Sequence, residues 1–283
     1  MAAGAAIVWL ASFPKSGNTW LRLLLANLLS GSAQPVDINR DQLHEFYPVY
    51  HVEAEELTLI DTSLLTREEI DLLRPILIEA GAAEANDPLY IKTHDAYRLN
   101  PDGEPLLGRG AARVALYIMR DPRDVAISLA FHNARSVDWA IERLNSSEHT
   151  LARSKHRLQP QLPQLVGDWS GHITSWTEQR DVPVHVLRYE DLRADPVGVF
   201  GAAIAFLGLD AAPAAVERAV RFADFAELQR QERQSGFRER NWKSDTPFFR
   251  AGRAGAWAEI LTPAQQEAIL AAHRPVMARF GYV

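Results

Sequence analysis

The 283-residue sequence contains no cysteine. This absence excludes disulfide bonds, thiolate nucleophiles and cysteine-ligated zinc or iron–sulfur centres. No apolar run approaches the roughly 20 residues of a membrane span, and no lysine or arginine precedes the short apolar start at 2–11. Basic residues are in the minority, with 30 Lys plus Arg against 36 Asp plus Glu. We therefore expect a soluble, cytoplasmic protein that binds neither membranes nor nucleic acid.

Short apolar runs alternate with amphipathic stretches along the chain. This order predicts βαβ units, and hence an α/β fold with a central parallel sheet flanked by helices. We expect strands at 5–10, 89–92, 114–119 and 184–189, and helices at 19–29, from Thr66, from Asp121, at 195–207 and from Thr262. Two polar segments, about 135–164 and 229–250, lack periodicity and are expected to be functional loops or disordered. No linker divides the chain, so the length predicts one domain over residues 1–283.

The segment 13–20, Phe-Pro-Lys-Ser-Gly-Asn-Thr-Trp, lies between the first predicted strand and helix. Unpaired backbone N–H groups at a helix start attract phosphate. Lys15 adds a positive charge, Gly17 permits close approach, and Ser16 and Thr19 add hydroxyl donors. The segment is P-loop-like, but its lysine precedes the glycine and the upstream glycine of G-x-x-x-x-G-K-[ST] is missing. The alternative is an ordinary turn with a surface lysine.

Two further segments place polar side chains at the ends of predicted strands. Arg120 ends the third strand, and Ser128 lies in the helix that follows. Lys92 and His94 flank the end of the second strand, where a histidine can act as a general base. Open α/β sheets bind ligands at the carboxyl ends of their strands. The alternatives are that Arg120 pairs with a nearby acid and that His94 is a plain packing residue.

The segment 249–257 follows a polar loop and interleaves Arg250 and Arg253 with Gly252 and Gly255. Two arginines between glycines suit a flap that closes on an anion. The alternative is a mobile basic loop.

Together these segments resemble the sulfotransferases that use 3'-phosphoadenosine 5'-phosphosulfate, and the resemblance covers nearly the whole chain. The segment Arg188-Tyr189-Glu190-Asp191 also resembles that family's nucleotide-contacting tyrosine motif. The resemblance implies that this donor is bound by Lys15, Ser16, Gly17, Asn18, Thr19, Trp20, Arg120, Ser128, Tyr189, Phe225, Arg250 and Gly252. It further implies a single sulfotransferase-like domain.

The motif Lys92-Thr93-His94 resembles the family's catalytic Lys-Thr-His. The resemblance implies in-line sulfuryl transfer to a hydroxyl of a small-molecule acceptor, with His94 as general base. Lys15 would stabilise the leaving phosphate and Lys92 the sulfuryl oxygens. Ser128 would bind the 3'-phosphate and hold Lys15 until the acceptor binds. No metal is implied.

The flap departs from the family pattern at Ala251, Ala256 and Ala258. These changes would weaken the grip on the 3'-phosphate, with Arg253 as a compensating cation. Aromatic residues in three segments, 46–51, 131–132 and 237–249, indicate a phenolic acceptor or a hydroxylated natural product. The alternative is that these aromatics only pack beneath loops.

Two other functions remain open at this point. A nucleotide-dependent phosphotransferase would use a similar sheet, but the sequence lacks its glycine–lysine loop and an evident magnesium carboxylate. A non-catalytic nucleotide-binding module would also fit the altered flap, although such a module needs neither Lys15 nor His94.

Overall fold

The computed structural model describes residues 7–40, 43, 50–109, 112–152 and 159–283. Contacts group the chain into two compact units. The first unit consists of Met1–Phe13, Leu43–Tyr117 and Ser147–Val184. The second consists of Pro14–Gln42, Ile118–Ser146 and His185–Val283. The single domain over residues 1–283 stays a prediction.

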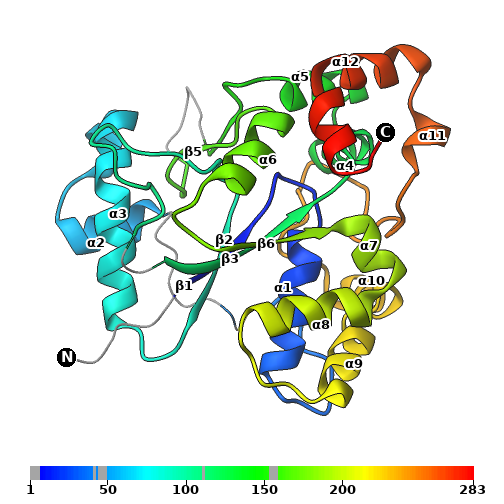
Figure 1. Ribbon diagram of the computed structural model, residues 1–283, viewed down its shortest axis with the longest axis horizontal. Helices are drawn as coiled ribbons and strands as arrows, with labels where there is room; N and C mark the ends of the chain where they lie inside the picture. The colour runs from blue at the N-terminus through cyan, green and yellow to red at the C-terminus, as the bar shows by residue number, and fades with distance from the viewer. Residues whose placement is uncertain (1–6, 41–42, 44–49, 110–111, 153–158) are drawn as a thin grey trace. The chain divides into compact units, whose positions relative to one another are not determined.

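A four-stranded sheet has the strand order β2-β1-β3-β6 (Figure 1). Its strands are β1 (Ile7–Ala11), β2 (Leu89–Thr93), β3 (Ala112–Met119) and β6 (Val184–Arg188). Strand β1 pairs in parallel with both β2 and β3, so that Trp9 lies opposite Ile91 and Ala115. All five β1 residues are buried, as a continuous apolar run predicts. The predicted α/β class with a central parallel sheet is confirmed.

The helices of the first unit bracket the strand β2 in sequence. They are α2 (His51–Thr58), a 3₁₀ turn (Thr62–Leu64), α3 (Arg67–Glu84) and α6 (Trp169–Glu178). A two-stranded sheet pairs β4 (Thr150–Leu151) with β5 (Gln164–Leu165). Thr66 and Glu69 form the predicted capping box at the start of α3. The sequence did not predict α6, although Trp169, Ile173 and Trp176 of α6 are buried at helical spacing.

The second unit holds most of the helices in the described part of the chain. They are α1 (Asn18–Leu29), α4 (Pro122–Asn133), α5 (Val137–Leu144), α7 (Tyr189–Ala194), α8 (Pro196–Phe206), α9 (Pro213–Phe222), α10 (Phe225–Ser235), α11 (Trp257–Ile260) and α12 (Pro263–Arg279). Asp121 caps α4, and Thr262 with Gln265 forms the predicted capping box of α12. Across the described ranges, no helix is both long and apolar enough to span a membrane.

Three sequence predictions need correction. The segment 135–164 contains α5 and the strands β4 and β5, and α10 extends to Ser235 within the segment 229–250. Helix α5 has only three buried side chains, so its periodicity is too short to detect; Ser136 caps it. Tyr189 does not end a strand but begins α7, since β6 ends at Arg188.

Candidate functional site

The predicted site residues fall into two groups, one in each unit. The first, called here the anion cluster, comprises Lys15, Arg120, Ser128, Tyr189 and Arg250 in the second unit. The second, called here the base segment, comprises residues 92–95 at the end of β2 in the first unit.

The loop before α1 has the backbone geometry of a tight turn. Lys15 and Gly17 both have positive φ angles, 69° and 109°, and Gly17 is the N-cap of α1. A Cβ atom at Gly17 would lie 2.8 Å from Cδ2 of Tyr189, so only glycine permits this approach. The hydroxyl of Ser16 is buried and has no hydrogen-bond partner among the residues that the structure describes. Such a donor at a helix start suits a phosphate oxygen.

A carboxylate contacts the first turn of α1. The Thr19 hydroxyl donates a hydrogen bond of 2.9 Å to Oε2 of Glu239. The buried Arg22 pairs with Oε1 of the same side chain. Glu239 therefore binds the Thr19 hydroxyl, which the resemblance assigns to binding of the sulfuryl donor. No sequence signal identified this contact, because Glu239 is 220 positions away from Thr19 and lies in a segment without periodicity.

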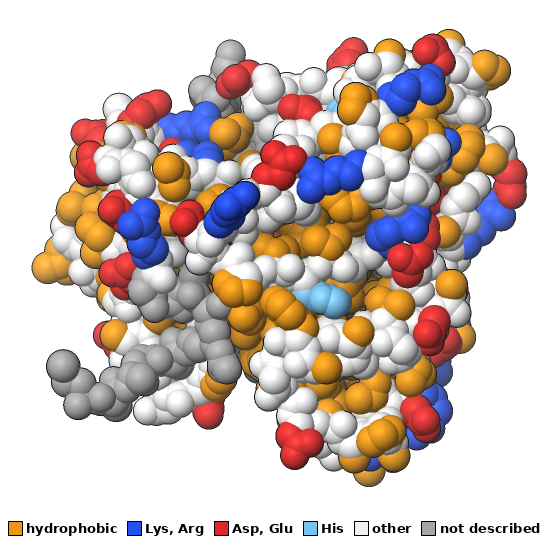
Figure 2. Space-filling model, in the orientation of Figure 1, with side chains coloured by type: hydrophobic (Ala, Val, Ile, Leu, Met, Phe, Trp, Pro, Cys, Tyr) orange, Lys and Arg blue, Asp and Glu red, His pale blue; other side chains and the backbone are white. Residues whose placement is uncertain are grey.

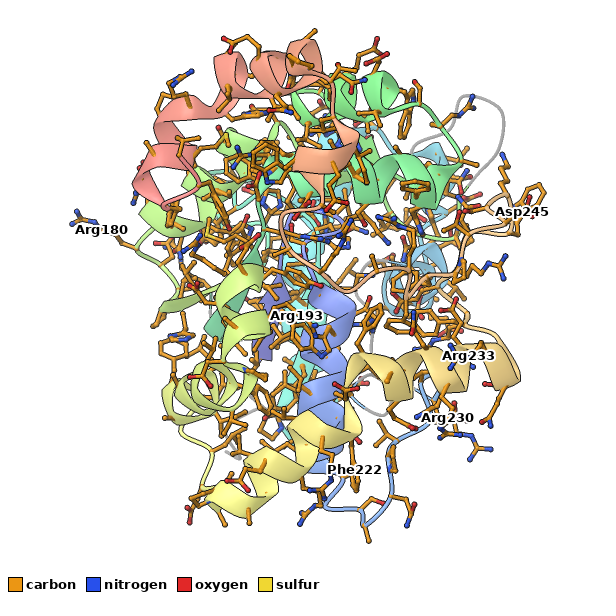
Figure 3. The ribbon with its side chains drawn as sticks, turned by 90° about the vertical axis from the view of Figure 1, so that its right-hand side faces the viewer. Arg180, Arg193, Phe222, Arg230, Arg233 and Asp245 are labelled. Carbon is orange, nitrogen blue, oxygen red and sulfur yellow. The ribbon has the colours of Figure 1, made fainter. Side chains whose placement is uncertain are left out.

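Two of the aromatic residues predicted to bind the donor nucleotide lie beside the loop. The ring centroids of Trp20 and Tyr189 are 5.7 Å apart, edge to face. Nε1 of Trp20 donates to the Ala223 carbonyl at 2.9 Å. The Arg193 guanidinium lies 5.4 Å from the Trp20 ring centroid, and Figure 3 shows Arg193 beside α1. Burial raises the pKa of Tyr189, so its hydroxyl stays neutral.

Arg120 contacts three different groups. Its guanidinium lies 4.3 Å from the ring centroid of Tyr189. Nη2 donates to the Arg253 carbonyl at 3.0 Å and lies 3.7 Å from Oδ2 of Asp124. The predicted alternative, pairing with a nearby acid, is thus also present. The side chain of Arg253 pairs with Glu259 at 3.0 Å. The cation that was expected to compensate for the altered flap therefore contacts a carboxylate.

Arg250 packs on an aromatic ring, with its guanidinium 4.2 Å from the Phe131 ring centroid. Burial, followed by repulsion from Arg120 and Arg253, lowers the pKa of Arg250. An anion bound beside Arg250 would relieve that repulsion. Gly252 has a φ of 58°, and a Cβ there would lie within 2.6 Å of the Phe225 ring. The flap therefore packs its backbone directly against Phe225, another residue predicted to bind the donor.

An open pocket in the second unit contains three of the predicted donor residues. Its lining residues are Lys15, Ser128, Phe131, His132, Arg240, Asn241, Ser244, Thr246, Pro247, Phe248 and Arg250. The ammonium of Lys15 lies 4.1 Å from the Phe248 ring centroid. The lining contains cationic and aromatic side chains and no carboxylate, so the pocket suits an anion.

The pocket also includes residues from two of the three predicted acceptor segments, 131–132 and 237–249. Residues 46–49 of the third segment lie outside the described residues. The contribution of Arg240 was not foreseen, because a single arginine in a charged loop carries no distinguishing signal.

His94 in the base segment has a defined ring orientation. Its Nδ1 lies 2.8 Å from the carbonyl oxygen of Ser12 and 3.3 Å from the Ser12 hydroxyl. A carbonyl oxygen only accepts, so Nδ1 carries the proton and Nε2 is the basic nitrogen. The backbone N–H of His94 donates to Oε1 of Gln164 at 3.3 Å.

Lys92 is the fourth residue of β2 and is half-buried. The remaining predicted residue, Asn18, begins α1 and is buried.

Acidic and basic side chains are interspersed on the face drawn in Figure 2, without a continuous basic patch. Within the described ranges, no group of three or more His, Asp or Glu side chains could hold a metal ion.

The family model described as "Sulfotransferase domain" matches residues 6–281. The chain is 25% identical to "Cytosolic sulfotransferase 16" of Arabidopsis thaliana over 266 residues, which cover 89% of this chain and 70% of that protein. It is 28% identical to "Luciferin sulfotransferase" of Photinus pyralis over 201 residues, 70% of this chain and 50% of that protein.

A solved structure has a similar fold. It is retinol dehydratase in complex with androsterone and the inactive cofactor PAP, with a TM-score of 0.59 and 20% identity. The match covers 96% of this chain and 80% of that one.

Proposed function

This chain belongs to the sulfotransferase domain family, and from that premise we propose its reaction: transfer of a sulfuryl group from 3'-phosphoadenosine 5'-phosphosulfate to a hydroxyl of a small-molecule acceptor. The observation that carries this proposal is the pocket that brings Lys15, Ser128 and Arg250 together without a carboxylate. Three of the residues chosen from sequence for one polyanionic donor thus line the same pocket. A cytoplasmic location is part of the proposal, supported by the relative named as a cytosolic enzyme.

The residues of the second unit fit the chemistry of the donor. The buried Ser16 hydroxyl and the start of α1, with Gly17, Asn18 and Thr19, would bind its 5'-phosphate side. Burial and the nearby cations Arg120 and Arg253 lower the pKa of Arg250, and an anion beside Arg250 would relieve this, which supports a 3'-phosphate site. Ser128 and Gly252 complete that site. The adenine contacts are Trp20, Tyr189 and Phe225.

The donor supplies an activated sulfuryl group, and this chain supplies a base and positive charge. Nε2 of His94 takes the proton from the acceptor hydroxyl, since Nδ1 is held as N–H by the Ser12 carbonyl. Lys92 neutralises the sulfuryl oxygens, and Lys15 stabilises the negative charge that develops on the leaving phosphate. Ser128 lines the same pocket as Lys15, which supports its role in holding Lys15 until the acceptor arrives.

The acceptor is proposed to be a phenol or another apolar molecule with a hydroxyl group. Phe131, Pro247 and Phe248 contribute apolar surface to the pocket beside its cations. The relative named luciferin sulfotransferase supports a small organic acceptor, as does the androsterone bound in the structure of retinol dehydratase.

Thermal unfolding with nucleotide ligands tests the proposal. We expect 3',5'-adenosine diphosphate to stabilise the protein more than 5'-AMP or ATP with magnesium. A ligand at 100 times its Kd adds about 2.7 kcal/mol to the free energy of unfolding, a measurable shift. Stabilisation by ATP with magnesium alone would contradict the proposal and favour a phosphotransferase. No stabilisation by any of the three would favour a non-catalytic protein.

A further inference from the structure

Two ion pairs join the segment that follows β2 to α3. In one pair α3 supplies the arginine, and in the other it supplies the aspartate. Arg74 of α3 donates from Nη1 and Nη2 to the two oxygens of Asp95, at 3.0 and 2.6 Å. Arg98 donates in the same two-pronged way to Asp71 of α3, at 2.5 and 2.6 Å. Each partner therefore contributes one arginine and one aspartate, three residues apart. Two parallel N–H···O bonds fix both distance and orientation.

The two ion pairs differ in burial. The side chains of Arg74 and Asp95 have no exposed surface, whereas Arg98 retains 19%. Removing two charges from water is costly, so a fully buried ion pair is a weak source of stability. Asp95 is also the residue directly after His94, and it accepts a hydrogen bond from the Thr93 hydroxyl at 3.4 Å. The location of this buried pair therefore calls for a reason other than stability.

Two side chains of helix α6 donate hydrogen bonds to backbone carbonyls of the same segment. Nε1 of Trp176 donates to the Asp95 carbonyl at 2.9 Å. Nε2 of His172 lies 3.2 Å from the His94 carbonyl, and Nδ1 of His172 lies 2.7 Å from the Tyr117 hydroxyl. A carbonyl only accepts, so Nε2 of His172 donates and Nδ1 accepts from the tyrosine. Burial lowers the pKa of His172 to about 3. His172 therefore stays neutral, and its two hydrogen bonds are unchanged, over the pH range in which a histidine of ordinary pKa titrates.

These contacts fix the backbone of His94 on both sides. Its N–H is bound by Gln164 and its carbonyl by His172, and its ring by the Ser12 carbonyl. The orientation of the ring follows from the backbone that carries it. A base that is misplaced by about 1 Å can lose 100-fold in rate.

We propose that Asp95, clamped by Arg74, is a positioning residue for His94: it fixes the segment so that Nδ1 of His94 stays on the Ser12 carbonyl and Nε2 stays the basic nitrogen. This inference rests on the proposed function of His94 as general base. It adds two residues, one from α3 and one from the segment after β2, to which the sequence analysis gave no role.

The test removes both charges at once, in the double variant Arg74→Met with Asp95→Leu. Replacing a buried ion pair by apolar side chains commonly preserves the fold, whereas removing one partner leaves an uncompensated charge. We expect an unchanged affinity for 3',5'-adenosine diphosphate and a kcat that falls about 10- to 100-fold. The ¹⁵N spectrum of labelled histidine rings should show His94 change from the Nδ1–H tautomer to a mixture.

The matched control is the double variant Asp71→Leu with Arg98→Met, which removes the other ion pair of the same helix and segment. We expect it to keep the kcat and the His94 ring spectrum of the parent protein. A folded Arg74→Met, Asp95→Leu protein with parental kcat and parental ring spectrum would overturn the proposal. Equal losses in both double variants would overturn it too, because they would indicate general loosening.

A second variant keeps the test decisive if the first does not fold. Arg74→Lys retains a positive charge beside Asp95 but loses the two-pronged geometry. We expect a partial fall in kcat and a partly mixed tautomer; parental values for both would overturn the proposal. The ring spectrum needs no turnover. A parent protein that transfers no sulfuryl group would therefore contradict the proposed function. The ring spectra of the parent protein and its variants would still decide whether Asp95 positions His94.

Discussion

The cations of the anion cluster and those behind the base segment have different kinds of partner. Lys15, Arg120 and Arg250 lie 4.1 to 4.3 Å from the ring centroids of Phe248, Tyr189 and Phe131. Arg74, by contrast, is bound by both oxygens of a buried carboxylate.

Cation–π contacts are worth about 0.5–1 kcal/mol at exposed sites, whereas breaking a buried ion pair costs about 3–5 kcal/mol. An incoming anion can therefore compete for Lys15 and Arg250 more readily than for Arg74. Arg120 is intermediate, since its Nη2 also lies 3.7 Å from Oδ2 of the buried Asp124. A cation on an aromatic face is thus more easily taken up by an anion than a cation bound by both oxygens of a buried carboxylate, which holds the chain in place.

The largest effect should come from the base segment. His94→Ala removes the proposed base, and we expect kcat to fall by about 10²- to 10⁴-fold. The affinity for 3',5'-adenosine diphosphate should be nearly unchanged, because the residues predicted to bind the donor belong to the second unit and His94 to the first. Steady-state kinetics and calorimetric titration measure the two quantities. A variant that keeps most of its kcat with its best acceptor would contradict the assignment of the base.

The anion cluster should respond in the opposite way. Arg250→Ala removes a charged donor, and we expect affinity for 3',5'-adenosine diphosphate to fall by about 10- to 100-fold, with affinity for 5'-AMP much less affected. Its matched control is Arg230→Ala. Arg230 projects from α10 in Figure 3 and pairs with Glu227. Equal losses for both nucleotides would show that Arg250 does not read the 3'-phosphate.

The buried histidine behind the base segment predicts a pH dependence of stability. The pKa of His172 is lowered by burial from 6.5 to about 3, so its neutral form stabilises the fold above pH 6.5. This contribution is lost as the pH falls from 6.5 toward 3, with a slope of up to about 1.4 kcal/mol per pH unit. Urea unfolding at several pH values should show a shallower slope in His172→Gln. Equal slopes in both proteins would contradict the buried neutral state.

The smallest effect should come from the carboxylate that contacts the first turn of α1. Glu239→Gln removes the negative charge that Thr19 and Arg22 now contact. We expect binding of 3',5'-adenosine diphosphate to tighten by about 2- to 5-fold, because a competing charge is lost. Glu227→Gln, on α10 and paired with Arg230, is the matched control. Weaker binding in Glu239→Gln would mean that the carboxylate supports the donor site instead of competing with it.

Local signals in the sequence predicted much of the fold. The apolar run of β1 and the caps at Thr66, Asp121 and Thr262 depend on neighbouring residues alone, and the structure bears them out. The family was also correctly identified, because its motifs are short and ordered along the chain.

The missed features depend on contacts between distant residues. Helix α5 is held by three buried side chains, and the Arg74–Asp95 pair joins residues 21 positions apart. The contact from Glu239 to Thr19 spans 220 positions. A charged residue carries no local sign of which partner it will meet, so such pairs emerge only with the tertiary structure. The individual roles of the predicted site residues stay predictions for the experiments above.

The close approach of Tyr189 to Gly17 has a consequence for how this sequence can change over time. Any side chain at position 17 would enter the space of the Tyr189 ring, and the backbone there already has a φ of 109°. The two positions therefore form one steric unit, although they are distant in sequence. Among descendants of this protein, a larger residue at position 17 should survive only together with a smaller one at position 189.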